Sequence, residues 1–232
     1  MQKNKFEHHD IWVVIPAYNE ETTIGQVLEQ FQGEPYSILV VDDCSTDGTS
    51  EIALKYPITL LRHIINLGQG AALQTGFDYI LKQTSAKYII TFDSDGQHQI
   101  SDLPKLLEPL KAENIDVTLG SRFITNETTK QIPFTKLVTL KLGLLFTKLT
   151  TKLKVTDTHN GLRGFTAEAL KKIQIHQNRM AHASEILSQI AKQELKYKEV
   201  PVAVLYTSYS KKKGQSVFNA FNILWDLFIG KE

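Results

Sequence analysis

The sequence has little that would cross-link it or carry it into a membrane. Its 232 residues contain one cysteine, Cys44, which excludes an internal disulfide and a cysteine-based zinc site and is typical of a reducing compartment. Residues 1–10 lack the apolar core of a signal peptide, and no window reaches the roughly 18 consecutive apolar residues of a membrane span. These absences predict a cytoplasmic protein without a transmembrane helix of its own.

What the sequence does contain is a regular alternation of short apolar runs and helix-like stretches. Hydrophobic residues make up 42% and charged residues 22%, which is ordinary for a globular chain of this length. The strand-like runs cover residues 11–16, 37–41, 58–61, 88–92 and 116–119, and helix-like stretches begin near residues 20, 46, 68 and 102. This alternation predicts an α/β fold with a mostly parallel central sheet flanked by helices. No linker or repeat divides the chain, so residues 1–232 are expected to form one domain.

The clearest chemical signal follows the fourth strand-like run. Its apolar residues end at Phe92, and Asp93, Asp95 and Gln97 come directly afterwards. Ligands of α/β sheets bind at the carboxyl ends of the strands, so these side chains lie where a ligand is expected. Carboxylates spaced by one residue suit a hard cation, Mg²⁺ or Mn²⁺, which usually also binds substrate phosphates. Taken alone, the same residues are also compatible with a polar turn.

Acidic residues also follow the first two strand-like runs. Glu20 comes shortly after the first run, and Asp42 and Asp43 come directly after the second. Carboxylates in these places can accept hydrogen bonds from a base or from ribose hydroxyls. Local roles stay open, because Glu20 would also favour the start of a helix and the polar residues after Asp43 could cap one.

Together these motifs resemble those of the family 2 glycosyltransferases, which have the GT-A fold, and the resemblance covers most of the chain in order. It implies that Asp95 and Gln97 are the direct metal ligands and that Asp93 faces the nucleotide sugar. The glycine-rich turn at residues 66–72 has Gln69 where family members often have lysine. The residues that the resemblance assigns to the nucleotide are Pro16, Ala17, Tyr18, Glu20, Asp42, Asp43, Gly68, Asp93 and Ser94.

Three further motifs are similar to those of one subgroup, the dolichyl- and polyprenyl-phosphate sugar synthases. They lie at residues 120–123, 157–165 and 199–202. The resemblance implies that a sugar moves from a nucleotide to a lipid phosphate in one displacement that inverts the anomeric centre. A basic motif of the subgroup begins here at Lys211, although Val217 replaces its final lysine.

The chemistry of a phosphate acceptor determines which residues are expected to be catalytic. A phosphate monoester is mostly ionised at neutral pH, so it needs cations that hold it near another anion more than it needs a general base. Arg122, Arg163 and Lys211 are the candidates for this role. They join Asp93 and Asp95 as the expected catalytic residues.

Two stretches have the pattern of amphipathic helices at a membrane interface. Residues 134–153 place apolar side chains on one helical face with lysines along its edge. Residues 216–229 follow a lysine triplet and carry three phenylalanines and Trp225. Packing on the core is the alternative for both. We expect a peripheral protein on the inner face of the cell membrane, with a small membrane-protein partner docked near residues 218–228.

Two rival functions remain open at this point. A glycosyltransferase that acts on a sugar hydroxyl, as in cell-surface polysaccharide synthesis, requires a general base, and Glu185 could supply it. A non-catalytic subunit that binds a nucleotide sugar is the third hypothesis, and the complete metal motif argues against it. The expected donor carries a hexose or an N-acetylhexosamine, with UDP favoured by the resemblance. The expected acceptor is polyprenyl phosphate, undecaprenyl phosphate in a bacterium, and no nucleic-acid partner is expected.

Overall fold

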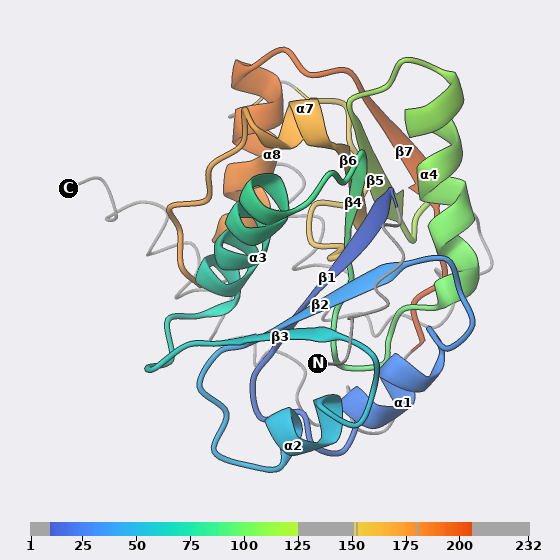
Figure 1. The fold of residues 1–232 in the computed structure, drawn as a ribbon. Coiled ribbons are helices and arrows are strands. Elements are labelled where there is room, and N and C mark those ends of the chain that lie inside the picture. Colours follow the sequence, from blue (N-terminus) through green and yellow to red (C-terminus); the bar gives the residue numbers. More distant parts are fainter. Residues whose placement is uncertain (1–9, 125–150, 152, 180, 206–232) are drawn as a thin grey trace.

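The computed structural model describes residues 10–124, 151, 153–179 and 181–205 (Figure 1). Lys211 and the predicted interfacial helix at residues 216–229 lie outside these residues, as does nearly all of the one at 134–153. No helix within the described part of the chain is long and apolar enough to cross a membrane.

A seven-stranded sheet forms the centre of the molecule, with the strand order β3-β2-β1-β4-β6-β5-β7. Neighbouring strands run parallel except at β6, which is antiparallel to both β4 and β5. The strands are β1 (Ile11–Ala17), β2 (Ser37–Asp42), β3 (Thr59–Arg62), β4 (Tyr88–Thr91), β5 (Val117–Ser121), β6 (Arg163–Thr166) and β7 (Tyr197–Pro201). The predicted α/β fold with a mostly parallel sheet is therefore confirmed.

Helices cover both faces of the sheet, as Figure 1 shows. Side chains alternate across each strand, so Val14 faces one layer of helices while Val13 and Ile15 face the other. The first layer contains α3 (Gln69–Gln83), α7 (Ala167–Leu170) and α8 (His182–Lys192), and the second contains α1 (Ile24–Glu29), α2 (Thr49–Ala53), the 3-10 turn η1 (Ile100–Asp102) and α4 (Leu103–Ala112). Because both faces are buried in the middle of the sheet, β1, β2 and β4 are nearly continuous apolar runs.

The position of β6 could not be read from the sequence. Its four residues, Arg163–Thr166, are too few to show an alternating pattern, and they follow a polar segment. In the sheet, Arg163 pairs with Thr91 of β4 on one side and with Leu119 of β5 on the other. This antiparallel insertion brings residues 157–162 to the carboxyl ends of β4 and β5, which is the edge where the acidic motif lies.

Candidate active site

The acidic turn begins just past β4, at the carboxyl edge of the sheet. The two carboxylate oxygens of Asp93 accept separate hydrogen bonds, from Gln69 Nε2 at 3.0 Å and from His98 Nε2 at 3.0 Å. Gly161 lies against the same carboxylate, and a Cβ at that position would come within 2.1 Å of Asp93 Oδ2. Asp93 is therefore held in one orientation by groups from three parts of the chain.

Asp93 and Asp95 have opposite electrostatic environments. Burial opposes the ionisation of Asp93, but the hydrogen bond and charge of His98, with smaller contributions from His182 and Arg163, hold the pKa of Asp93 below its ordinary value. Burial, and then the charge of Asp93, raises the pKa of Asp95 to about 6. Ionisation of Asp95 beside the ionised Asp93 is therefore less favourable than in water, and a cation beside the pair would offset this repulsion.

The end of β1 forms the adjoining part of the edge. Ser94 Oγ donates a hydrogen bond to the carbonyl of Pro16 at 2.9 Å, which joins the acidic turn to this strand. Ala17 is buried, whereas 44% of Tyr18 is exposed. Glu20 is buried, and its Oε2 accepts a hydrogen bond from Thr23 Oγ1 at 3.0 Å. The predicted nucleotide residues of the first strand therefore lie beside the acidic motif.

Asp43 shapes the glycine-rich turn that follows β3. Its Oδ1 accepts hydrogen bonds from His63 Nδ1 at 2.7 Å and from the Leu67 backbone N–H at 2.9 Å. Its Oδ2 accepts the Gly68 N–H at 2.6 Å. Asp43 is thus committed to three groups of the protein itself, an internal role that the sequence did not indicate.

Asp42 is fully buried and binds polar groups that follow β2. Its Oδ1 accepts the Ser45 N–H at 2.8 Å, and its Oδ2 contacts Ser50 Oγ and lies 3.5 Å from Arg62 Nε. Its carboxylate is 0% exposed, so a direct contact with a nucleotide would require the loop after β2 to open. Nucleotide binding by Asp42 stays a prediction.

The glycines of the turn allow a second segment to approach α3. Gly68 has a φ of 102°, and a Cβ there would lie 2.4 Å from the carbonyl oxygen of Asn178. The same carbonyl accepts the Gly70 N–H at 2.7 Å. The first amides of α3 are therefore bound by the protein's own backbone, so the glycines serve packing at this point.

Glu185 lies in the first turn of α8 and anchors the segment before that helix. Its carboxylate accepts the His176 N–H at 3.0 Å and the Gln177 N–H at 2.8 Å. These contacts give Glu185 a structural role, because its carboxylate oxygens accept backbone hydrogen bonds. A general base would instead accept a proton from the acceptor.

The two arginines predicted to bind phosphate are both buried. Arg122 forms an ion pair with Asp157, with its Nε 2.6 Å from Asp157 Oδ2. Arg163 donates to the carbonyls of Asn160, Thr158 and Ala183 at 3.2, 3.2 and 3.3 Å. Its Nη1 is buried and has no hydrogen-bond partner among the residues that the structure describes. Burial lowers the pKa of Arg163 to about 10, so the guanidinium is still charged at neutral pH.

Comparison with known proteins agrees with this geometry. Residues 12–174 match the model of the family described as glycosyl transferase family 2. The chain belongs to glycosyltransferase family 2. The match covers β1 to β6 and therefore includes the acidic turn and the glycine-rich turn.

Relatives of this glycosyltransferase include proteins that are similar over nearly the whole chain. An uncharacterised protein of Methanocaldococcus jannaschii is 42% identical over 99% of this chain and 96% of its own length. The UDP-N-acetylglucosamine–dolichyl-phosphate N-acetylglucosaminyltransferase of Methanococcus voltae is 34% identical over 95% of this chain and 96% of its own length.

Solved structures show the same fold at lower identity. Glucosyl-3-phosphoglycerate synthase of Mycobacterium tuberculosis is 20% identical, covers 94% of this chain and 77% of its own, and has a TM-score of 0.69. Complexes of that enzyme contain Mn²⁺ or Mg²⁺ with UDP. The likeness confirms the GT-A fold of this glycosyltransferase.

The donor set of the glycosyltransferase fits a divalent cation. Asp95 and Gln97 lie together, with Gln97 Nε2 2.8 Å from Asp95 Oδ2. No group of three or more His, Cys, Asp and Glu side chains within the described residues is arranged to hold a metal. A carboxylate and an amide oxygen are nevertheless what Mg²⁺ or Mn²⁺ takes from a protein when substrate phosphates supply other ligands. Asp95 and Gln97 are thus the residues that would hold the ion.

Three residues of the site were missed in the sequence or given no role. His98 is 3% exposed and binds Asp93, Gln69 binds the other oxygen of Asp93, and Gly161 leaves room for that carboxylate. His98 lies one residue after Gln97, which was the only local signal. Gln69 and Gly161 are 24 and 68 residues away from Asp93 in the chain, so only the fold brings them together.

Proposed function

We propose that this glycosyltransferase transfers a hexose or an N-acetylhexosamine from a nucleotide sugar to polyprenyl phosphate, with inversion at the anomeric carbon. The observation that carries the proposal is the oriented Asp93 beside the Asp95 and Gln97 pair at the carboxyl edge. Relatives named for lipid-phosphate acceptors support it. They include the Methanococcus voltae enzyme, dolichol-phosphate mannosyltransferase of Pyrococcus furiosus at 28% identity and polyprenol monophosphomannose synthase of Mycolicibacterium smegmatis at 30%.

A UDP-sugar is the favoured donor in this proposal. The enzyme of Methanococcus voltae, 34% identical over nearly all of both chains, is named for UDP-N-acetylglucosamine. Other relatives are named for mannose or glucose, so the sugar itself is left at the level of a hexose or N-acetylhexosamine. The nucleotide would lie along the ends of β1 and β4, between the exposed Tyr18 and Asp93.

The reaction is a single displacement at the anomeric carbon of the donor. An oxygen of the lipid phosphate forms a bond to that carbon while the bond to the nucleoside diphosphate breaks. A divalent ion held by Asp95 and Gln97 would supply positive charge for the departing diphosphate. Asp93, held by His98 and Gln69, would orient the donor sugar for the attack.

Cations are needed to bring the acceptor phosphate close to the donor. Within the described part of the chain, Arg163 Nη1 has no hydrogen-bond partner, and the charge of Arg163 contributes to lowering the pKa of Asp93. It is therefore the described residue best suited to this role. Arg122 is a weaker candidate because its guanidinium faces Asp157. Lys211, outside the described residues, stays a prediction from the sequence.

A transfer assay tests the proposed function. The protein is incubated with labelled UDP- and GDP-sugars, polyprenyl phosphate in membranes, and Mg²⁺ or Mn²⁺, with and without EDTA. We expect label in an organic-extractable product that mild acid releases and that EDTA abolishes. Label that enters only a water-soluble glycan would contradict the proposal.

Replacement of Glu185 by glutamine separates the proposal from transfer to a sugar hydroxyl. Glutamine keeps one oxygen that can accept the His176 or Gln177 N–H, so we expect a loss of about 1 kcal/mol of stability. Transfer to polyprenyl phosphate should fall less than about tenfold, because an ionised phosphate needs no general base. The measurement is kcat in the transfer assay, with Glu168→Gln, on the exposed surface of α7, as the matched control. A loss of two or more orders of magnitude would favour the hydroxyl acceptor.

The proposed location is the surface of the membrane that holds the acceptor. Relatives named for dolichyl or polyprenyl phosphates act on a lipid, so the carboxyl edge of this sheet would have to reach a bilayer. The inner face of the cell membrane, and a small membrane-protein partner near residues 218–228, stay predictions from the sequence.

A further inference from the structure

Exposed apolar side chains are concentrated at one edge of the molecule. Among the residues that the structure describes, seven large apolar side chains are exposed, and six of them follow the carboxyl end of a strand. Tyr18 follows β1 and is assigned above to the nucleotide. The other five, which we call the apolar rim, are Ile64, Ile65 and Leu67 after β3, Ile124 after β5 and Leu205 after β7.

All five residues of the apolar rim follow strands that run in the same direction. β5 is antiparallel to β6, which is antiparallel to β4, and β7 is parallel to β5, so β3, β5 and β7 all end at the edge of the acidic turn. Leu205 donates its N–H to the carbonyl of Gln97 at 2.9 Å, which places this part of the rim beside the metal motif. The seventh exposed residue, Leu54, follows α2 and precedes β3, at the opposite edge.

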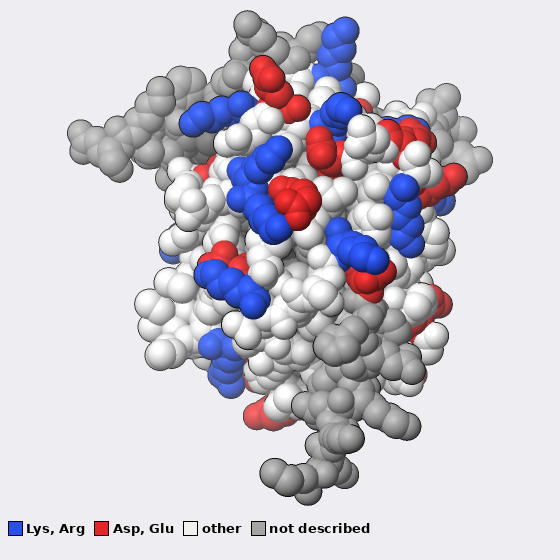
Figure 2. Space-filling view, turned by 45° about the horizontal axis from the view of Figure 1, so that its top comes forward, with Lys and Arg blue, Asp and Glu red and all other residues white. Residues whose placement is uncertain are grey.

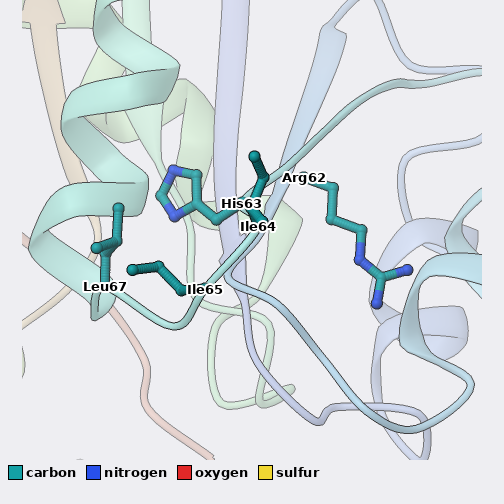
Figure 3. Close-up of a pocket in the computed structure, with 5 residues that line it drawn as sticks. All are labelled: Arg62, His63, Ile64, Ile65 and Leu67. Atoms are coloured by element: carbon teal, nitrogen blue, oxygen red, sulfur yellow. The ribbon is translucent and has the colours of Figure 1, made fainter.

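The loop after β3 is the most exposed part of the rim. Ile64 is 95% exposed and Ile65 is 63% exposed. Figure 1 shows this loop projecting beyond the end of β3. Residues Arg62, His63, Ile64, Ile65 and Leu67 line a hollow of about 510 Å³, and Figure 3 shows how their side chains lie, with Arg62 pointing away from Ile65 and Leu67.

The backbone of this loop is firmly held. The carbonyl of Ile64 accepts a hydrogen bond from Cys44 Sγ at 3.3 Å. Asn66 Nδ2 donates a hydrogen bond to the carbonyl of Asp43 at 3.2 Å, and the Leu67 N–H donates one to Asp43 Oδ1. The isoleucines are therefore exposed on a loop whose conformation is fixed by hydrogen bonds. Single exposed apolar side chains are ordinary, but a concentration of them at one edge indicates an interaction surface.

We propose that the apolar rim rests on a lipid bilayer and thereby turns the active site toward its lipid-linked acceptor. The inference rests on the proposed function, because a polyprenyl chain stays in the bilayer while its phosphate lies at the surface. The carboxyl edge of the sheet carries both the acidic turn and the exposed isoleucines, so contact of this edge with the bilayer would bring the active site near the acceptor phosphate. By contrast, Figure 2 shows a face on which Lys and Arg are interspersed with Asp and Glu, as is usual for a surface in contact with water.

The chain that continues from the rim has the composition of a membrane-binding sequence. Residues 125–150 follow directly after Ile124, and residues 206–232 follow directly after Leu205. The first segment contains four lysines and one acidic residue, and the second contains a lysine triplet, three phenylalanines and Trp225. Positive charge next to apolar side chains favours a bilayer with anionic lipids over a second protein surface.

Flotation of the full chain with vesicles of phosphatidylcholine and phosphatidylglycerol tests the inference. Ile64→Glu/Ile65→Glu should weaken vesicle binding by about tenfold or more, because two apolar side chains that would enter the interface become charged. Ile64→Leu/Ile65→Leu should bind like the wild type, and so should Leu54→Glu at the opposite edge. Thermal stabilisation by UDP and Mn²⁺ should be the same in all four proteins, which would show that the fold and the nucleotide site are intact.

Several results would overturn the inference. One is that Ile64→Glu/Ile65→Glu binds vesicles as well as the wild type does. Another is that Leu54→Glu loses as much binding as the double variant. A third is a large fall in the melting temperature of the double variant, which would mean that another part of the chain covers the rim. A dimer that the glutamates dissociate would assign the rim to a second copy. If binding depends on the rim but no sugar reaches polyprenyl phosphate, the docking surface stands and the proposed function fails. If sugar reaches polyprenyl phosphate but vesicle binding does not depend on the rim, the proposed function stands and the docking surface fails.

Discussion

Replacement of Asp95 by asparagine is expected to lower sugar transfer by about 10³-fold. The carboxylate is one of the two proposed ligands of the divalent ion, and loss of preorganised charge stabilisation typically costs two to three orders of magnitude in kcat. The asparagine has almost the same volume and can still accept the Gln97 N–H that Asp95 accepts at 3.0 Å. The measurement is kcat in the transfer assay over a range of Mg²⁺ or Mn²⁺ concentrations. Asp78→Asn, on the exposed surface of α3, is the matched control and should leave kcat unchanged.

The stability of the Asp95→Asn variant distinguishes lost chemistry from a lost fold. The pKa of Asp95 is raised in the folded protein to about 6 from an ordinary 3.8. Its ionisation therefore lowers the stability of the metal-free protein as pH rises from about 4 through about 6. Asparagine never ionises, so in EDTA at pH 7.5 the variant should melt at the same temperature as the wild type or at a higher one. If Asp95→Asn transferred sugar at a rate within tenfold of the wild type, Asp95 would not be a ligand of the metal.

Replacement of Asp157 by alanine is expected to cost about 3–5 kcal/mol of stability, the range for breaking a buried ion pair from one side. The side chains of Arg122 and Asp157 are 6% and 0% exposed, and Asp157 Oδ2 also accepts the Arg122 backbone N–H at 3.2 Å. Without the carboxylate, the arginine would have to remain charged in a buried place. In a protein of this size the loss corresponds to a fall of roughly 10 °C in melting temperature, measured by calorimetry.

Two further variants show whether the loss comes from the buried charge. Asp157→Ala combined with Arg122→Met removes both charges and should recover part of the stability, since apolar residues often replace a buried ion pair at little cost. Glu113→Ala breaks a pair with Lys198 in which both side chains are more than two-fifths exposed, and it should cost less than about 1 kcal/mol. A melting temperature of Asp157→Ala within about 2 °C of the wild type would contradict the prediction. Arg122 would then be available for the acceptor phosphate.

The sequence was sufficient for the fold class because local pattern and final burial coincide in most of the sheet. Residues 37–41 and 88–92 are apolar runs, and the strands observed there, β2 and β4, are buried on both faces. The start of α3 near Gly68 was predicted within one residue. The antiparallel β6 was missed, because which strand enters a sheet depends on contacts between residues far apart in the chain.

The sequence by itself determined which side chains stand at the carboxyl ends of the parallel strands, because an apolar run followed by acidic residues specifies both the strand and its end. It thereby determined the acidic motif, its family and the chemistry of the ligands. Only the tertiary structure decided which neighbours each candidate side chain contacts. It binds Asp43 to the glycine-rich turn, Arg122 to Asp157 and Glu185 to two backbone amides, and it surrounds Asp93 with Gln69, His98 and Gly161. The physical reason is that hydrogen bonds and ion pairs are satisfied by whichever groups the fold brings within about 3 Å, and spacing along the chain does not encode those neighbours.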